Sequence, residues 1–201
     1  MKIGAEFDNS KWPALKTRLK ADEADAWREA VTILENRIGG RYLAHGTLIL
    51  NRSYSGFAVL AIDCAVIEAL QQFREGKKET PWKKVGTYFR RFLTKTRFKF
   101  TDDEADRFFD TVRNGILHQA ETKHDTVVNK KQEKVIIKNT PSGKGIVINA
   151  RRFHEELVLA FGDYKRALLN GDKTLRENFI EKMNHVCRTP EAKIPVVLAT
   201  P

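Results

Sequence analysis

The sequence of 201 residues has few of the features that mark disulfide-stabilised, secreted or membrane-spanning proteins. It contains only two cysteines, Cys64 and Cys187, so a disulfide framework is not expected. Its most apolar run, FAVLAIDCAVIEAL (57–70), is too short to span a bilayer and contains two carboxylates. No long apolar stretch follows the first basic residue. We therefore expect no secretory signal, no membrane partner and a cytoplasmic protein.

Acidic residues are also fewer than basic ones. The chain has 36 Lys and Arg against 26 Asp and Glu, which gives a formal net charge of +10. This excess favours association with polyanions, most commonly nucleic acid, although a generally basic surface explains it equally well. A hydrophobic fraction of 41% with 12 Phe is ordinary for a globular protein, so we expect a single domain over residues 1–201.

The spacing of apolar residues predicts helices over most of the first half of the chain. An amphipathic helix is expected between residues 21 and 43, with Gly39-Gly40 weakening its last turn; its apolar stripe contains Trp27, Val31, Leu34 and Ile38. Residues 54–75 are apolar nearly all round, which is typical of a helix at the centre of a bundle. Residues 1–20 are interpreted as an irregular N-terminal arm.

Two start signals lie between residues 74 and 104. The polar stretch 74–82 breaks the pattern, and Pro81 suits the beginning of a helix. A short basic helix is expected over 83–100. Thr101, followed by Glu104, then forms the capping box that opens another helix.

The pattern changes after residue 121. Two β-branched runs predict a β-hairpin over 134–150, and two helices are expected over 151–188, followed by an extended tail, 189–201. With a helical core over 21–121, the predicted fold class is mainly α: a helical bundle with one small β-hairpin inserted before a C-terminal helical pair.

The stretch TVRNGILHQAE (111–121) places Arg113 close to His118. In an unbroken α-helix the two side chains would lie about 140° apart around the axis. A break at Asn114-Gly115 would let both point into one cleft. There an arginine fork would bind phosphate, and a histidine, which titrates near neutral pH, would transfer protons. Such pairs also occur by chance, so the spacing alone favours a structural role.

Two carboxylates lie within the apolar segment 54–75. Asp63 and Glu68 would be costly in a dry core unless each had a cationic or hydrogen-bonding partner. Arg113 is an obvious partner for one of them. The alternative is that both carboxylates lie at the helix surface and are solvated.

The segment VRNGILHQAE resembles the signature of the HEPN families (higher eukaryote and prokaryote nucleotide-binding domains), in which His follows Arg after four to six residues. Arg113, Asn114 and His118 occupy its three places. AIDCAVIEALQQF resembles the family's acidic core helix, with Glu68 or Asp63 in the acidic role. The order of elements agrees from about residue 21 to residue 170. Segments 77–100 and 134–150 resemble family-specific additions.

The resemblance implies a HEPN-type bundle that cleaves RNA without a metal or cofactor. In the family, the motifs of two subunits meet across a homodimer axis and form a composite catalytic cleft. Many members are toxins or anti-phage nucleases, which implies an antitoxin or regulatory protein as a further partner. Other members have lost catalysis and bind only RNA or proteins, so a non-catalytic module is the alternative.

The basic helix over 83–100 is a second candidate contact for RNA. Arg90, Arg91, Lys95 and Arg97 alternate with aromatic residues, a composition that can follow a nucleic-acid backbone. In the alternative interpretation the aromatic side chains enter the core and the cations extend to solvent. That interpretation is favoured for Tyr88, Phe89 and Phe92.

Overall fold

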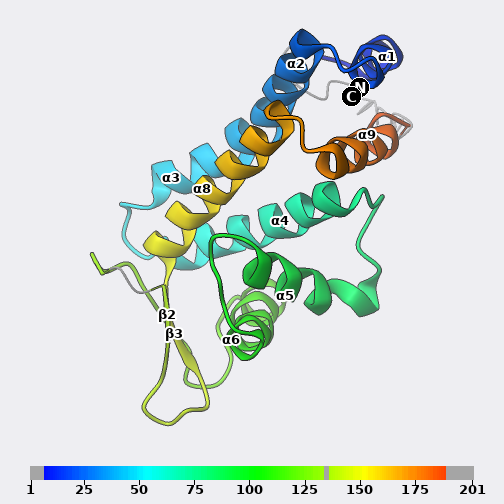
Figure 1. Cartoon of the computed structure of the whole chain (residues 1–201). Coiled ribbons are helices and arrows are strands. Elements are labelled where there is room, and N and C mark those ends of the chain that lie inside the picture. Colours follow the sequence, from blue (N-terminus) through cyan, green and yellow to red (C-terminus); the bar gives the residue numbers. More distant parts are fainter. Residues whose placement is uncertain (1–6, 134–135, 189–201) are drawn as a thin grey trace, which may run out of the picture.

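The computed structural model describes residues 7–133 and 136–188, and the predicted tail over 189–201 lies outside the described residues. The chain is mainly helical with one small sheet, as the sequence predicts (Figure 1). Two of its helical segments, η2 (Glu35–Leu43) and η4 (Phe108–Arg113), are π-helical. Such segments are rare and often occur at functional sites.

The N-terminal segment is more regular than predicted. After the 3-10 turn η1 (Asn9–Lys11), helix α1 (Trp12–Lys20) replaces the expected irregular arm. Pro13 lies in the first turn, where its missing N–H costs nothing. Leu15 and Leu19 are buried, and the indole of Trp12 donates to Asn184 Oδ1 at 3.1 Å. Long-range contacts therefore hold this segment as a helix.

A continuous helical rod follows, composed of α2 (Ala24–Leu34), η2 and α3 (Ala44–Ile49). The predicted weak turn at Gly39-Gly40 does not end the helix, because the chain continues through the π-helical segment. Gly39 is buried, and a Cβ there would lie 2.2 Å from Glu35 Oε1. The rod lies beside α8 (Ala150–Leu169), the longer of the two C-terminal helices (Figure 1).

Helix α4 (Gly56–Glu75) is the predicted central helix. It packs against α8, α9 (Lys173–Arg188), η2 and α5 (Val85–Lys95). By length and composition α4 could cross a membrane, which corrects the estimate that the apolar segment is too short. More than half of its most apolar window is buried inside the fold, as in the core helix of a soluble protein.

The middle of the chain forms a second group of helices around α4. The 3-10 turn η3 (Trp82–Lys84) follows Pro81 as predicted, and α5 ends at Lys95, five residues before the predicted end. The Thr101–Glu104 capping box is confirmed at the start of α6 (Asp102–Arg107). Helix α6 leads into η4 and then into α7 (Asn114–Gln119).

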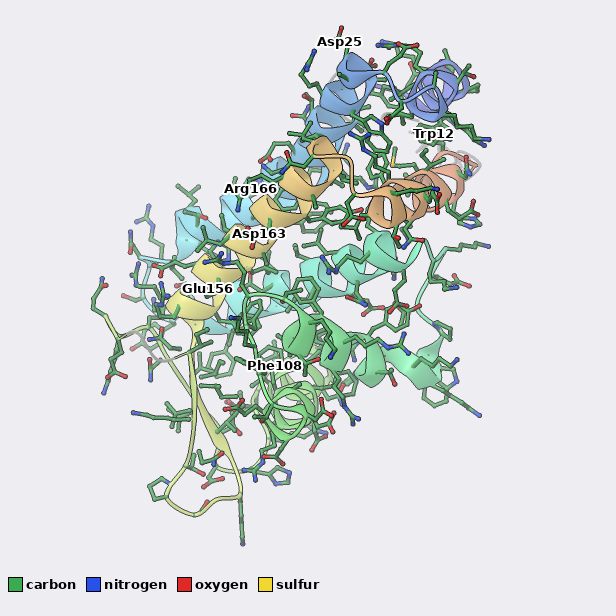
Figure 2. All side chains as sticks on the ribbon, in the orientation of Figure 1. Trp12, Asp25, Phe108, Glu156, Asp163 and Arg166 are labelled. Atoms are coloured by element: carbon green, nitrogen blue, oxygen red, sulfur yellow. The ribbon has the colours of Figure 1, made fainter. Side chains whose placement is uncertain are left out.

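The sheet has three short strands in the order β1-β3-β2. Antiparallel β2 (Ile137–Asn139) and β3 (Ile146–Asn149) confirm the predicted hairpin. Strand β1 (Val127–Asn129) pairs parallel to β3 and was not predicted, because three residues are too few to show a period. Asn149 then caps α8, along which Glu156, Asp163 and Arg166 follow one another (Figure 2).

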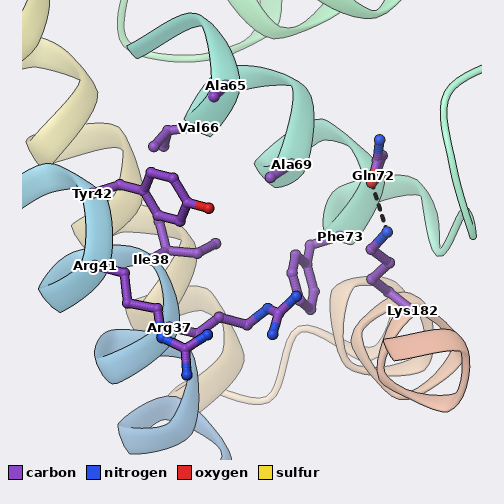
Figure 3. Close-up of a pocket in the computed structure, with 10 residues that line it drawn as sticks. All are labelled: Arg37, Ile38, Arg41, Tyr42, Ala65, Val66, Ala69, Gln72, Phe73 and Lys182. Atoms are coloured by element: carbon purple, nitrogen blue, oxygen red, sulfur yellow. Dashed lines mark hydrogen bonds between the residues drawn. The ribbon is translucent and has the colours of Figure 1, made fainter. Parts of the chain in front are cut away.

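A cavity of about 160 Å³ lies between η2, α4 and α9 (Figure 3). Polar and apolar side chains line it together, and these are Arg37, Ile38, Arg41, Tyr42, Ala65, Val66, Ala69, Gln72, Phe73 and Lys182.

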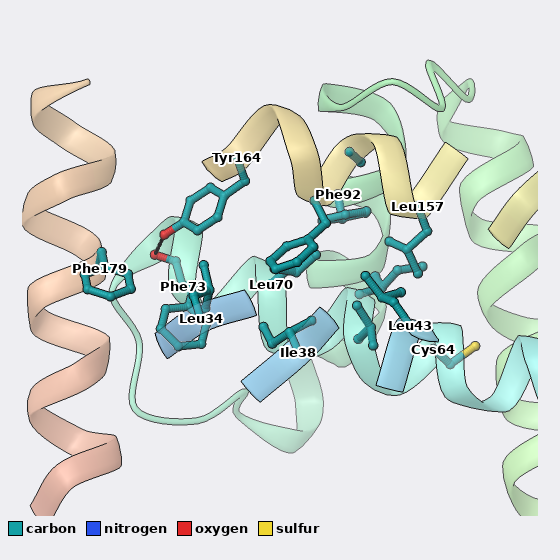
Figure 4. Packing of buried hydrophobic residues seen from close by; sticks show 14 of the residues in the cluster. Leu34, Ile38, Leu43, Cys64, Leu70, Phe73, Phe92, Leu157, Tyr164 and Phe179 are labelled. Carbon is teal, nitrogen blue, oxygen red and sulfur yellow. Dashed lines mark hydrogen bonds between the residues drawn. The ribbon is translucent and has the colours of Figure 1, made fainter. Parts of the chain in front are cut away.

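The apolar core extends from α9 across α4 to α5 and α8 (Figure 4). The Phe108 and Phe153 rings stack with centroids 4.6 Å apart, which joins η4 to α8. Cys64 and Cys187 are buried free thiols, in agreement with the absence of a disulfide framework. Burial raises the pKa of Cys187 to about 11, which keeps this thiol protonated and unreactive at neutral pH.

Candidate functional site

The segment that contains Arg113, Asn114 and His118 lies on an uninterrupted helical run from Asp102 to Gln119. The predicted break at Asn114-Gly115 is therefore wrong, and Asn114 has ordinary helical angles. Gly115 is needed for a different reason: a Cβ there would lie 2.4 Å from the carbonyl oxygen of Glu121. The glycine lets the following loop pack against the helix, which ends where Ala120 adopts a left-handed conformation.

Arg113 lies at the end of η4, and its guanidinium is held by polar and aromatic neighbours. One terminal nitrogen lies 3.6 Å from Glu68 Oε2, an ion-pair distance, and the other donates to Asn114 Oδ1 at 3.0 Å. The guanidinium carbon is 5.5 Å from the centroid of Phe109 and 5.9 Å from that of Phe89. Arginine stacks well on aromatic rings, so its position is well defined.

Part of the Arg113 side chain remains accessible. It is 16% exposed, and the Glu68 side chain is 27% exposed. The Nε of Arg113 is buried and has no hydrogen-bond partner within the described residues. The pairing of Arg113 with a carboxylate of α4 agrees with the sequence interpretation, and Glu68 is the carboxylate that makes it.

His118 lies in the last turn of α7 and is exposed. Within the described part of the chain it makes no hydrogen bond or ion pair. Because α7 is a regular helix, Arg113 and His118 lie about 140° apart around the axis. Neither residue lines the cavity between η2, α4 and α9. One copy of the chain thus does not bring the arginine and the histidine together in that cavity.

Asp63 is not part of the Arg113 cluster, which corrects its predicted role beside the motif. It is 0% exposed, and its Oδ1 lies 2.7 Å from His154 Nδ1 on α8. Burial raises the pKa of the Asp63 carboxyl, and the contact with His154 opposes this rise. The alternative in which both carboxylates are solvated is also wrong for Asp63.

The His154 ring continues this polar contact towards the surface. Its Nε2 lies 2.9 Å from Thr47 Oγ1 on α3, and Thr47 Oγ1 also donates to the carbonyl of Leu43 at 3.0 Å. Gly46 makes room for the ring, since a Cβ there would lie 2.5 Å from His154 Cε1. The sequence showed His154 only as an isolated histidine. The position of His154 on the apolar face of α8 was the one signal in the sequence that this histidine is buried.

Three of the four predicted RNA-contacting cations on and after α5 are bound to carboxylates. Arg90 pairs with Asp106, Arg91 with Glu75 at 2.9 Å, and Arg97 with Glu156 at 3.2 Å and Asp163 at 3.4 Å. Lys95 is exposed and has no ion pair within the described residues. Tyr88, Phe89 and Phe92 are buried, as predicted. These contacts leave Lys95 as the most available of the four cations.

Comparisons with family models, with curated proteins and with solved structures find no match for this chain. The resemblance to HEPN proteins therefore depends on the residues of the motif and on the acidic central helix. Among the residues that the structure describes, no group of three or more His, Cys, Asp or Glu side chains is placed to hold a metal ion.

Proposed function

We propose that this chain is a metal-independent endoribonuclease with a helical fold of HEPN type, in which Arg113 and His118 act on RNA. The observation that carries the proposal is the cluster of Arg113, Glu68 and Asn114, which shares one helical run with the exposed side chain of His118. The net charge of +10 supports a polyanionic substrate.

RNA carries its own nucleophile, so the chemistry needs only proton transfer and charge stabilisation. The ribose 2′-oxygen attacks the adjacent phosphorus as the bond from phosphorus to the 5′-oxygen breaks. One His118 removes the 2′-proton, and a second protonates the departing 5′-oxygen. Arg113 stabilises the charge on the phosphorane oxygens, and the Asn114 amide donates to the same group. The products are a 2′,3′-cyclic phosphate and a 5′-hydroxyl.

The active site is composed of two copies of the chain. Arg113 and His118 diverge around their helix, so the arginine of one copy needs the histidine of another to complete the cleft. Leu117, next to His118, is an exposed large apolar residue and is available to contact the second copy. Such a nuclease would suit a toxin or an anti-phage effector held in check by an antitoxin or regulatory protein.

The second candidate function is a module that binds RNA, or a partner protein, without cleaving. One observation favours it: Arg113 already has Glu68 as a counter-ion and two aromatic rings as neighbours. A guanidinium engaged in this way can orient a bound phosphate and stabilise the fold without taking part in catalysis.

Cleavage of a long RNA in EDTA by the purified chain distinguishes the two functions. We expect the wild type to cleave, His118→Ala to lose cleavage, and His124→Ala to keep it as a matched control, since His124 is exposed six residues further along. An oligonucleotide with one 2′-deoxyribose should resist cleavage at that position. RNA binding without cleavage would support the module, and cleavage by His118→Ala at the wild-type rate would contradict the nuclease.

A further inference from the structure

The cavity between η2, α4 and α9 is basic. Three of its lining residues are cationic, and none of them is acidic; the cations are Arg37, Arg41 and Lys182. Arg37 and Arg41 lie four positions apart on η2, so both side chains reach the same side of the rod. Figure 3 shows Arg37 extending from η2 towards Phe73, Arg41 on the same helix, and the Lys182 ammonium directed at Gln72.

Arg37 has no counter-ion within the part of the chain that the structure describes. It makes no hydrogen bond or ion pair there, in contrast to Arg113. Burial, and then the neighbouring Arg41, lower the pKa of Arg37. A partly buried guanidinium beside a like charge is costly until an anion neutralises it. The site is therefore poised for an anion.

Lys182 supplies a third donor group and is itself buried. Its Nζ donates to the side-chain oxygen of Gln72 and to the carbonyl of Lys78, each at 2.6 Å. Both acceptors are neutral, and an ammonium has three hydrogens, so one remains for a ligand. The two hydrogen bonds hold Nζ in place through Gln72 on α4 and Lys78 in the following loop.

The shape of the cavity limits the size of the ligand. Ala65 and Ala69 lie one turn apart on α4, and their short side chains leave the space open. A cavity of about 150 Å³ holds a benzene-sized molecule, so about 160 Å³ accommodates one phosphate group but no oligonucleotide. Tyr42 also lines the cavity and is 44% exposed, so it offers an aromatic surface to solvent.

We propose that this cavity binds the phosphate of a phosphate monoester, such as a mononucleotide or the 5′-phosphorylated end of an RNA. Arg37 and Arg41 bind the phosphate oxygens as planar forks, Lys182 donates its third hydrogen, and an attached base stacks on Tyr42. The proposal is independent of RNA cleavage, because it uses none of the residues of the Arg113 cluster.

Calorimetric titration of the full chain tests the proposal with four probes: inorganic phosphate, adenosine 5′-monophosphate, and a short RNA with either a 5′-phosphate or a 5′-hydroxyl. We expect all three phosphates to bind and the 5′-hydroxyl RNA to bind at least about tenfold more weakly than its phosphorylated form. Equal affinity for phosphate and the nucleotide would assign the site to a free anion. Tighter nucleotide binding would assign it to a nucleoside phosphate.

Variants separate the cavity from the general basic charge. Arg37→Gln and Lys182→Gln should each weaken binding roughly tenfold, because each removes a charge-assisted hydrogen bond. Ala69→Leu should abolish binding by filling the space while every charge is kept. Arg28→Gln, which removes an exposed arginine from α2 on the same rod, should leave binding unchanged.

Two results would overturn the proposal. One is that none of the three phosphate probes binds with a Kd below about 10 mM. The other is binding that Arg37→Gln, Lys182→Gln and Ala69→Leu all leave at the wild-type level, since the phosphate would then lie elsewhere. Circular dichroism of each variant confirms that it is folded, and the Ala69→Leu result does not depend on the removal of any charge.

Discussion

Arg113 and Arg37 both lie in π-helical segments that pack against α4, but their surroundings differ. Arg113 has Glu68 at 3.6 Å, a hydrogen bond to Asn114 and two aromatic rings. Among the residues that the structure describes, Arg37 shares its cavity with two further cationic side chains and no carboxylate. Glu68 and Ala69 are consecutive on α4, and about 100° around its axis separates them. One residue step along α4 thus separates an arginine that has a counter-ion, Arg113, from one that has none among the described residues, Arg37.

This difference indicates which role each arginine can have. A guanidinium with a built-in counter-ion contributes to folding in the absence of any ligand. A guanidinium without one costs stability until an anion arrives. Removal of the charge should therefore lower the free energy of unfolding at Arg113 and raise it at Arg37.

The largest effect on stability is expected for Arg113→Met. Loss of this arginine leaves Glu68 partly buried without a partner, so the free energy of unfolding should fall by about 2 kcal/mol. Urea denaturation measures the change, and Arg113→Lys should recover part of it. An unchanged denaturation midpoint for Arg113→Met would show that the ion pair contributes nothing.

Arg37→Met should have the opposite sign. In phosphate-free buffer its free energy of unfolding should rise by about 1 kcal/mol, because the change removes a partly buried charge that has no counter-ion among the described residues. Added phosphate should raise the melting temperature of the wild type and leave that of the variant nearly constant. Destabilisation of Arg37→Met as large as that of Arg113→Met would remove the contrast between the two sites.

Lys182 should make anion binding depend on pH. Burial is the largest cause that lowers its pKa, to about 8; Arg37 on η2 lowers it further, and Glu79 opposes the change. Sulfate binds the charged ammonium, so its affinity should fall roughly fivefold between about pH 7 and pH 9. Calorimetry of Lys182→Gln should show no such fall, and a rise in wild-type affinity with pH would contradict the assignment.

The same group sets a trend in stability without ligand. The pKa of Lys182 lies below the ordinary lysine value of 10.5, so between about pH 8 and pH 10.5 the unfolded chain binds more protons than the folded one. The contribution of Lys182 to the free energy of unfolding therefore increases with pH across this window. Urea denaturation of the wild type and of Lys182→Gln isolates this contribution as the difference between their free energies of unfolding. A difference that falls as the pH rises would contradict the prediction.

The smallest effects are expected on α5. Lys95→Gln should weaken RNA binding and reduce the slope of log affinity against log salt by about 0.7, since a free cation contacts phosphate. Arg90→Gln should change the slope less, because Asp106 already pairs with Arg90. Equal slopes for the two variants would contradict this distinction.

The sequence predicted the local features of the fold well. Periodicity located α4 and α8, the capping box located the start of α6, and β-branched runs located the hairpin. It missed α1 and the parallel strand β1 because long-range packing and pairing define them. It also placed a break at Asn114-Gly115, where Gly115 instead permits a close approach of the loop at Glu121.

The candidate site was partly readable from the sequence. A carboxylate within an apolar helix requires a partner, which led correctly to a pair between Arg113 and one of the two carboxylates of α4, and the structure shows that this carboxylate is Glu68. The same argument could not assign Asp63 to His154, because the two residues are 91 positions apart. The cationic cavity could not be predicted for a similar reason, since Arg37 and Lys182 are far apart in the sequence. They line one cavity only because α9 packs against α4.

One measurement tests the account most directly. It compares the rates of RNA cleavage in EDTA by Arg113→Gln and Arg37→Gln, at a temperature where both variants are folded. We predict that Arg113→Gln loses cleavage by a factor of about 100 or more, because its charge stabilises the phosphorane. Arg37→Gln should cleave within about twofold of the wild type, because a charge far from the transition state leaves its energy unchanged. Loss of cleavage in Arg37→Gln, with cleavage intact in Arg113→Gln, would contradict the assignment of the two sites.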